Sequence, residues 1–178
     1  MGTVLSGKLM AEEQIVAELV LHGVHYLSQS IPIHVDDSRP VAQLLADLIR
    51  QPSSRVRTAM IALLLEHPEY APYVPEAVLR LRGSDRILIK LFYTAAVILQ
   101  KEYSSMLEKY QGRELRWLPD NFSQELGLPS ELPPEESLKI LSTRHSELMG
   151  SKANWLGTYK NVAQHLFHQK ELEHLWNP

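Results

Sequence analysis

The sequence predicts an all-α protein, and three observations support this fold class. Apolar residues recur at spacings of three and four along most of the chain, for example in the stripe of Val41, Leu44, Leu45, Leu48 and Ile49. This is the period of an amphipathic helix. Proline and glycine residues separate the stretches, as they do at helix ends. No stretch shows the alternation that is typical of a strand or a hairpin.

Six or seven helices follow from these patterns. Ser38 is a suitable N-cap for the second helix, with Pro40 in its first turn. Gly83 and Gly150 mark the ends of two others. The most apolar run, residues 87–99, predicts the central and most buried helix. The expected spans are about 10–28, 39–49, 54–67, 75–82, 85–110, 135–149 and 155–175.

A single domain is the simplest organisation for a chain of 178 residues. Within residues 1–178 we expect a helical core over 38–110, a proline-rich connector over 111–134 and a C-terminal helical pair over 135–178. The connector is expected to pack onto the helices through three residues, Trp117, Leu118 and Phe122.

Composition excludes several classes of function. Cysteine is absent, which excludes disulfides, thiolate catalysis and cysteine-ligated metal sites. The net charge of −3 gives no strong global attraction to nucleic acid or membranes. No apolar run reaches the roughly 18–20 residues that span a bilayer, and the first residues lack the apolar core of a secretory signal. We therefore expect a cytoplasmic protein that does not bind membranes.

Two segments in the middle of the chain are similar to each other. Residues 40–44 (PVAQL) match residues 75–79 (PEAVL) at an offset of 35. Residues 38–105 resemble about two units of HEAT and armadillo-type helical repeats, whose second helix commonly begins as Val56-Arg57 does here. The resemblance implies stacked helix pairs that present a protein-binding surface. An irregular helical bundle with accidental similarity is the alternative.

Arginine residues flank both turns of the repeat-like region, and stacking of the two units would place them along one edge. Clustered guanidinium groups hold phosphate or carboxylate through paired hydrogen bonds. This arginine edge is therefore a candidate site for a nucleic-acid backbone or an acidic partner. The interpretation that we favour is that these side chains only solvate the turns. The six residues are Arg50, Arg55, Arg57, Arg80, Arg82 and Arg86.

Three aromatic residues lie outside the helical patterns. Tyr70 and Tyr73 belong to the proline-rich break HPEYAPYVP, and Trp176 lies near the end of the chain. Aromatic side chains in such places either form hot spots for a partner or hold a segment in place. We favour packing, and keep Tyr70 and Tyr73 as candidate binding residues.

Histidine pairs are the remaining candidates for chemistry. His22 and His25, and likewise His165 and His168, are spaced one helical turn apart, near enough to share a metal. The chain lacks the repeated Glu-x-x-His pairing of a di-iron bundle, a Gly-x-Ser-x-Gly elbow and a phosphate-binding glycine loop. We therefore favour ordinary histidines, with no metal and no cofactor.

Taken as a set, these features favour a non-catalytic helical adaptor or regulatory partner that binds another protein. Two alternatives stay open. One is a factor that binds the phosphate backbone of nucleic acid along the arginine edge. The other is a metalloprotein or enzyme that uses the histidine pairs inside a helical bundle. The sequence does not determine the oligomeric state.

Overall fold

The computed structural model describes residues 3–28 and 39–177, with side chains from residue 12 onward, and its regular secondary structure there is entirely helical. The predicted all-α class is confirmed, whereas the predicted cap at Ser38 lies outside the described residues. No helix in the described ranges is long and apolar enough to cross a membrane. The elements are α1 (Thr3–Leu21), α2 (Val41–Ile49), α3 (Ser54–Glu66), the 3₁₀ helix η1 (Pro68–Tyr73), α4 (Val74–Arg80), α5 (Ser84–Glu102), α6 (Ser104–Gln111), α7 (Pro134–Met149) and α8 (Trp155–Trp176).

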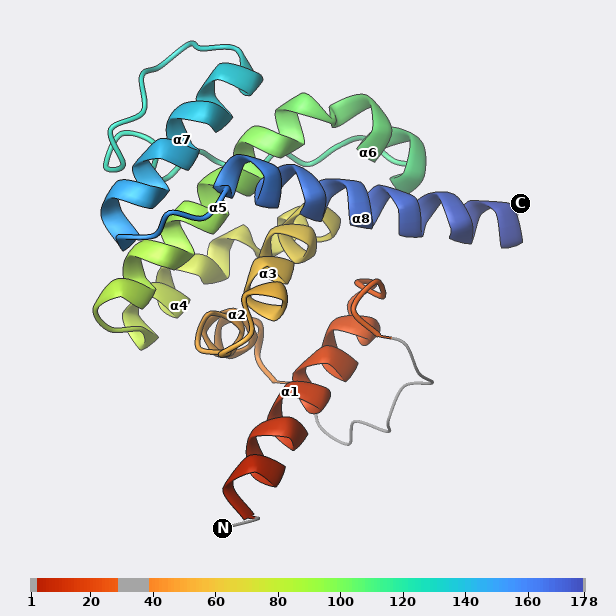
Figure 1. Ribbon diagram of the computed structural model, residues 1–178. Coiled ribbons are helices and arrows are strands. Elements are labelled where there is room, and N and C mark those ends of the chain that lie inside the picture. The colour runs from red at the N-terminus through yellow and green to blue at the C-terminus, as the bar shows by residue number, and fades with distance from the viewer. Residues whose placement is uncertain (1–2, 29–38, 178) are drawn as a thin grey trace.

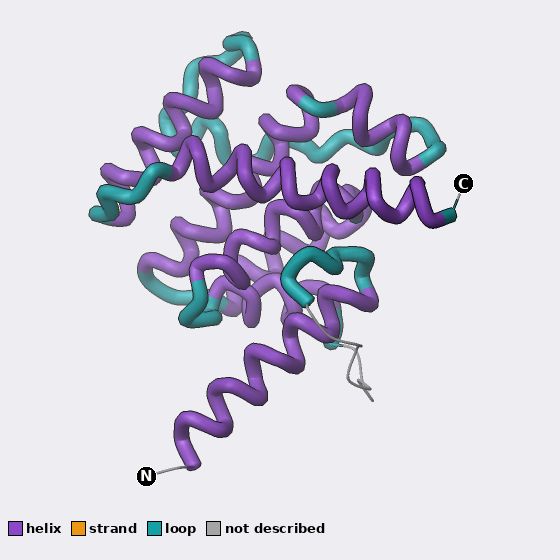
Figure 2. The backbone as a smooth tube through the Cα atoms, turned by 45° about the vertical axis from the view of Figure 1, so that its right-hand side comes forward, coloured by secondary structure: helices purple, strands orange, loops and turns teal. Residues whose placement is uncertain are grey.

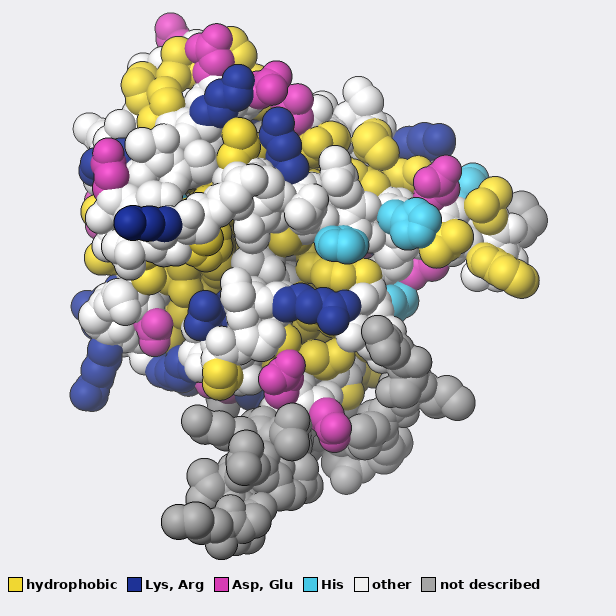
Figure 3. Space-filling view, in the orientation of Figure 1, with side chains coloured by type: hydrophobic (Ala, Val, Ile, Leu, Met, Phe, Trp, Pro, Cys, Tyr) yellow, Lys and Arg dark blue, Asp and Glu magenta, His cyan; other side chains and the backbone are white. Residues whose placement is uncertain are grey.

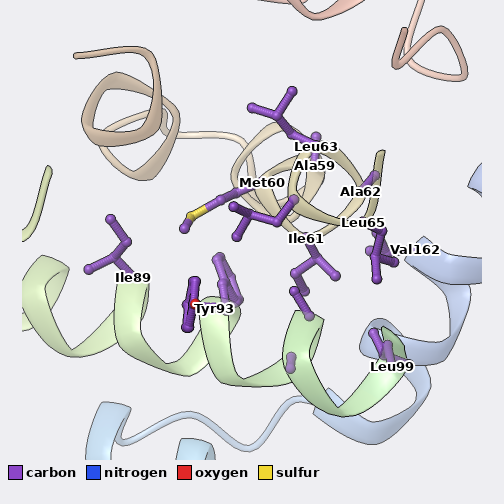
Figure 4. Packing of buried hydrophobic residues seen from close by; sticks show 14 of the residues in the cluster. Ala59, Met60, Ile61, Ala62, Leu63, Leu65, Ile89, Tyr93, Leu99 and Val162 are labelled. Atoms are coloured by element: carbon purple, nitrogen blue, oxygen red, sulfur yellow. The ribbon is translucent and has the colours of Figure 1, made fainter. Parts of the chain in front are cut away.

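Helix α5 is the central element of the fold, as its apolar sequence predicts (Figure 1). Residues 91–100 are all buried, including the polar Thr94 and Gln100. The helix packs along both α7 and α3, and Figure 4 shows Met60 and Ile61 of α3 facing it. A helix that is covered around its circumference has to be apolar on every face, which explains the composition of this segment.

The repeat-like region folds into two neighbouring helix pairs. Helix α2 packs on α4, and α3 packs on α5. The first helices of the two units therefore contact each other, and so do the second helices. Stacked helix pairs give this arrangement. The resemblance to HEAT and armadillo repeats itself stays a prediction.

The first helix ends seven residues earlier than predicted, at Leu21 instead of residue 28. Gly23 has φ 86°, a left-handed conformation that glycine adopts easily. The Val24 N–H donates to the carbonyl of Leu19 at 2.9 Å, and the Gly23 N–H donates to that of Val20 at 3.0 Å. These two bonds form a Schellman motif. The apolar pattern continues beyond Gly23, but the chain turns there.

The predicted helix over 85–110 is two helices. It breaks at Tyr103, whose φ of −109° and ψ of 23° leave helical values. The Tyr103 ring lies 5.0 Å from the ring of Phe167 in α8, and Tyr110 of α6 stacks on the same ring at 6.5 Å. The change of direction therefore lets α6 pack against α8.

The connector before α7 is fixed against α5 by polar side chains of that helix. Gln100 donates to the carbonyl of Arg116 at 2.7 Å and accepts from the Leu118 N–H at 2.8 Å. The Phe122 ring packs edge-on against Tyr93 at 5.4 Å. Leu118 and Phe122 thus pack as predicted, but Trp117 is exposed, because the bonds to Gln100 hold the chain on each side of it.

Helix α8 closes the fold and extends beyond it. Its first half packs against α3, α5 and α7, and its last turns project past the other helices (Figures 1 and 2). The turn that follows α1 lies beside this projecting part. The turn after α1 and the C-terminal part of α8, which are far apart in the sequence, are thereby brought together at one side of the molecule.

Replacement of Leu91 by alanine tests the central position of α5. Leu91 is fully buried, so we expect Leu91→Ala to lower the free energy of unfolding by roughly 2–5 kcal/mol, measured by urea denaturation. Leu79 on α4 is 74% exposed and is the control, for which we expect a change within about 0.5 kcal/mol. Similar small losses for both variants would contradict the assigned core.

Candidate functional site

A groove runs between the turn after α1 and the C-terminal half of α8, and we call it the α1–α8 groove. Its volume is about 490 Å³. The turn contributes an imidazole and a phenol, and α8 contributes two imidazoles and two large apolar side chains. The lining residues are His25, Tyr26, His165, His168, Gln169, Leu172, Glu173, Trp176 and Asn177.

Gln169 is the residue that holds the two walls together. It is 8% exposed, and its side-chain oxygen accepts from the backbone N–H groups of His25 at 2.7 Å and Tyr26 at 3.2 Å. Its nitrogen donates to the carbonyl of Gly23 at 2.9 Å and to the Glu173 carboxylate at 2.9 Å. The side-chain amide of Gln169 thus provides hydrogen-bond partners for three backbone groups of the turn. These groups lie outside any helix or sheet and so have no partners in regular secondary structure.

Side chains add two further contacts across the groove. The ring nitrogens of His25 lie 2.6 Å from the Glu173 carboxylate and 3.0 Å from the carbonyl of Val20, both within hydrogen-bonding distance. The ring of Tyr26 stacks on that of His165, with centroids 5.3 Å apart and an interplanar angle of 14°. The turn is therefore fixed on α8 by backbone and side-chain contacts together.

An exposed apolar stripe continues along α8 from this groove. Leu172, Leu175 and Trp176 are 44%, 71% and 82% exposed, and their spacing of three and four places them on one side of the helix. Figure 3 shows apolar and histidine side chains next to each other over this part of α8. The predicted packing of Trp176 is therefore wrong, because the helix carries it beyond the body of the protein.

The structure separates the first histidine pair and brings the second pair to the groove. His22 and His25 are not one helical turn apart, because α1 ends at Leu21. His22 accepts or donates a 2.7 Å bond with the hydroxyl of Tyr70, away from the groove. His25 instead lines the α1–α8 groove, as do His165 and His168 of α8. Within the described residues, no group of three or more His, Asp or Glu side chains is placed to hold a metal ion.

Most of the six predicted arginines are engaged by their own chain. The guanidinium groups of Arg50, Arg57 and Arg86 donate to backbone carbonyls near helix ends, those of Arg80, Gln51 and Leu81 respectively. Helix ends carry carbonyls without intrahelical partners, and arginine commonly satisfies them. Arg80 pairs with Glu76 at 2.8 Å. For these four arginines, the contacts agree with the interpretation that the side chains only solvate the turns.

Arg55 and Arg82 differ from the other four. The side chain of Arg82 is exposed and makes no hydrogen bond or ion pair with any described residue. Arg55 lies at the start of α3, where it donates a long 3.4 Å bond to the carbonyl of Tyr26. A binding role for any of the six arginines stays a prediction.

The two candidate tyrosines have different environments. Tyr70 stacks on His67, with ring centroids 4.7 Å apart. His67 in turn donates to the carbonyl of His22 at 2.6 Å, so Tyr70 belongs to a cluster that joins η1 to the end of α1. Tyr73 is exposed and stays a candidate contact. Packing accounts for Tyr70 but not for Tyr73.

A histidine outside the two predicted pairs lies in the core. His145 of α7 is fully buried and stacks on Trp155 at 3.6 Å. It shares a hydrogen bond with the hydroxyl of Tyr159, while its Nε2 has no partner among the described residues. Burial lowers the pKa of His145 to about 4, because a desolvated imidazolium is unfavourable.

Sequence reasoning also missed Gln169, although it carries a recognisable signal. Trp155, Tyr159, Val162 and Leu166 form the apolar stripe of α8, and Gln169 continues it at the next spacing of three. A polar residue in a core register is expected to have buried hydrogen-bond partners. The signal indicates that partners exist, but not which segment supplies them.

Comparison of the chain with protein-family models, with curated proteins and with solved structures gave no match.

Burial of His145 predicts that stability falls with acidification. The unfolded chain has the ordinary histidine pKa near 6.5 and the folded protein one of about 4. The unfolded state therefore binds more protons below pH 6.5, and stability is lost as the pH falls from there toward 4. We expect the free energy of unfolding to drop by about 2 kcal/mol between pH 7 and pH 5, measured by urea denaturation at both pH values.

The variant His145→Gln should remove most of this pH dependence, with His174→Gln, at an exposed histidine, as the control. Burial and the nearby His67 also lower the pKa of His22, which adds a smaller loss in the same direction. An unchanged slope in His145→Gln would contradict the assignment to His145.

Proposed function

We propose that the protein is a non-catalytic helical adaptor that binds an apolar helical segment of another protein in the α1–α8 groove. The observation that carries the proposal is the exposed stripe of Leu172, Leu175 and Trp176 beside the groove. Large aromatic and aliphatic side chains left in water are costly, and where they gather they are typical of protein-binding surfaces.

The charge of the groove supports an apolar occupant. Among the described residues, its wall contains no lysine or arginine, and the one carboxylate, Glu173, is already engaged by His25 and Gln169. Leu172 and Trp176 supply the apolar surface. A charged segment would find no unpaired opposite charge in the groove itself.

The spacing of the stripe supports a helical occupant. Leu172 and Leu175 are three residues apart, and Leu172 and Trp176 are four apart. Residues at these spacings lie on one face of a helix, the face that packs against another helix. A partner helix with apolar residues at the same spacings could lie along α8 and insert side chains into the groove. The protein would then recognise its partner by a helix-in-groove contact.

Two further features belong to this proposal. We propose that α2–α5 form two HEAT-like pairs that act as the rigid support of the groove. We also propose a cytoplasmic location, which is consistent with a chain that contains no cysteine. The arginine edge is a less favoured site, because Arg50, Arg57 and Arg86 satisfy carbonyls of their own chain.

Photo-crosslinking tests the groove directly. A benzoyl-phenylalanine placed at Leu172 should crosslink a partner in lysate of the source cells, and the same group at Leu79, exposed on α4, should not. The partner should resist nuclease and high salt, since its contact is mainly apolar. Mass spectrometry of the adduct identifies the segment, which we expect to be amphipathic and helical.

The variant Trp176→Ser should weaken binding of that partner at least roughly tenfold, as expected for a hot-spot aromatic. Leu79→Ser is the matched control and should bind normally, and the unfolding midpoint should be the same for both. Equal binding by both variants, or retention that disappears with nuclease or salt, would overturn the proposal.

A further inference from the structure

A second, smaller pocket adjoins the α1–α8 groove, and we call it the Arg55 pocket. Its volume is about 170 Å³. It shares Tyr26 and His165 with the groove, so the stacked pair of rings separates the two. Three elements converge here: the turn after α1, the start of α3 and the first half of α8. The lining residues are Tyr26, Arg55, Thr58, Thr158, Asn161, Val162 and His165.

The wall of the Arg55 pocket carries an uncompensated positive charge. None of the described residues that line it is acidic, and Arg55 forms no ion pair with any residue that the structure describes. This differs from Arg39, Arg50, Arg80 and Arg144, each of which has a carboxylate within 3.1 Å. The one bond of Arg55, to the carbonyl of Tyr26, is long at 3.4 Å. Most of the five N–H donors of its guanidinium are therefore available.

Other donors surround the charge. The amide of Asn161 is exposed and makes no side-chain hydrogen bond within the described part of the chain. The same holds for the ring nitrogens of His165, whose ring only stacks on Tyr26. Asn161 and His165 belong to α8 and Arg55 to α3, and all three side chains line the same pocket.

Tyr26 adds a further donor. Its hydroxyl is buried and has no hydrogen-bond partner among the described residues. Burial raises the pKa of this hydroxyl well above its usual value, and the charge of Arg55 opposes the rise only in part. The group therefore keeps its proton. A buried donor without an acceptor is unfavourable, and an acceptor entering beside Arg55 would relieve it.

We propose that the Arg55 pocket binds the phosphoryl group of a phosphorylated side chain on the segment that occupies the α1–α8 groove. A phosphoryl group offers three strong acceptor oxygens and a charge of about −2, which matches a wall of donors around one cation. Arginine holds such a group through paired hydrogen bonds. A carboxylate has fewer acceptor positions and would leave donors unused. The identity of the carrier rests on the proposed adaptor function, whereas the phosphoryl chemistry rests on the pocket alone.

A nucleic-acid backbone fits the surroundings less well. Binding to a backbone uses several cations along a line, but Arg50, Arg57 and Arg86 are engaged with carbonyls of their own chain. The Arg55 pocket is a single site, and beyond the stacked rings it continues into an apolar groove. One phosphoryl group on a protein segment therefore suits the arrangement better than a row of phosphates.

Titration of the full chain with inorganic phosphate, at constant ionic strength, tests the pocket without a partner. Two-dimensional NMR would follow the side-chain signals of Arg55, Asn161 and His165. We expect saturable shifts of these signals, with affinity reduced at least roughly tenfold in Arg55→Gln. The matched control is Arg82→Gln, at an exposed arginine outside the pocket, which should bind phosphate normally. Acetate should give no saturable shift.

The proposed phosphate site would be overturned if the shifts did not saturate or if acetate produced equally strong shifts. It would also be overturned if Arg55→Gln and Arg82→Gln lost the same amount of phosphate affinity. The phosphate titration does not depend on Trp176. Phosphate binding can therefore be observed even if the crosslinking test of the groove fails, and a partner can be crosslinked even if phosphate does not bind. Once a partner is crosslinked, phosphatase treatment should weaken its binding to the wild-type protein but not to Arg55→Gln. Salt-sensitive binding of a single-stranded oligonucleotide that depends on Arg55 would overturn the assignment to a phosphorylated protein.

Discussion

Burial of α5 on all sides is the constraint on which the rest of the structure depends. Residues 91–100 are buried without interruption, so neighbouring elements have to cover the whole circumference of this segment, and α3, α7 and the connector do so. Its polar side chains then need partners in the interior. Tyr93 and Gln100 find theirs in the carbonyls of Pro119 and Arg116, and Thr94 in that of Lys90. The connector is thus ordered by α5.

The fold class and the place of α5 could be predicted because both depend on local patterns of apolar residues. Prediction failed where one residue outweighs such a pattern. The apolar period continues past Gly23, yet a Schellman motif ends α1 there. Likewise the period continues past Tyr103, yet its ring packs on Phe167 and the helix breaks. The end of α1 has a local cause, the glycine and its two backbone bonds, which the apolar period does not register. At Tyr103 the deciding contact is tertiary, so the local sequence does not reveal it.

The candidate site was less predictable than the fold, because it joins distant segments. The bond from the His25 N–H to Gln169 spans 144 residues, and the stack of Tyr26 on His165 spans a similar distance. Sequence analysis selected His25 and His165 for their spacing to other histidines, whereas the structure relates them to each other across the groove. It also grouped Arg55 with five other arginines, although Arg55 faces α8. Residue type indicated the chemistry, but only the fold determined which residues meet.

The shared wall between the groove and the Arg55 pocket has a consequence for partner recognition. A partner segment in the groove gains affinity from the apolar area that it buries, but apolar burial alone does little to fix the orientation of the segment. A charged contact beyond the Tyr26–His165 stack would fix the register and direction of the bound segment. Two contacts on one segment also reinforce each other, because the second is made at high effective concentration. Both sites depend on the turn that Gln169 holds on α8. A change in the position of that turn would therefore alter the apolar and the charged contact together.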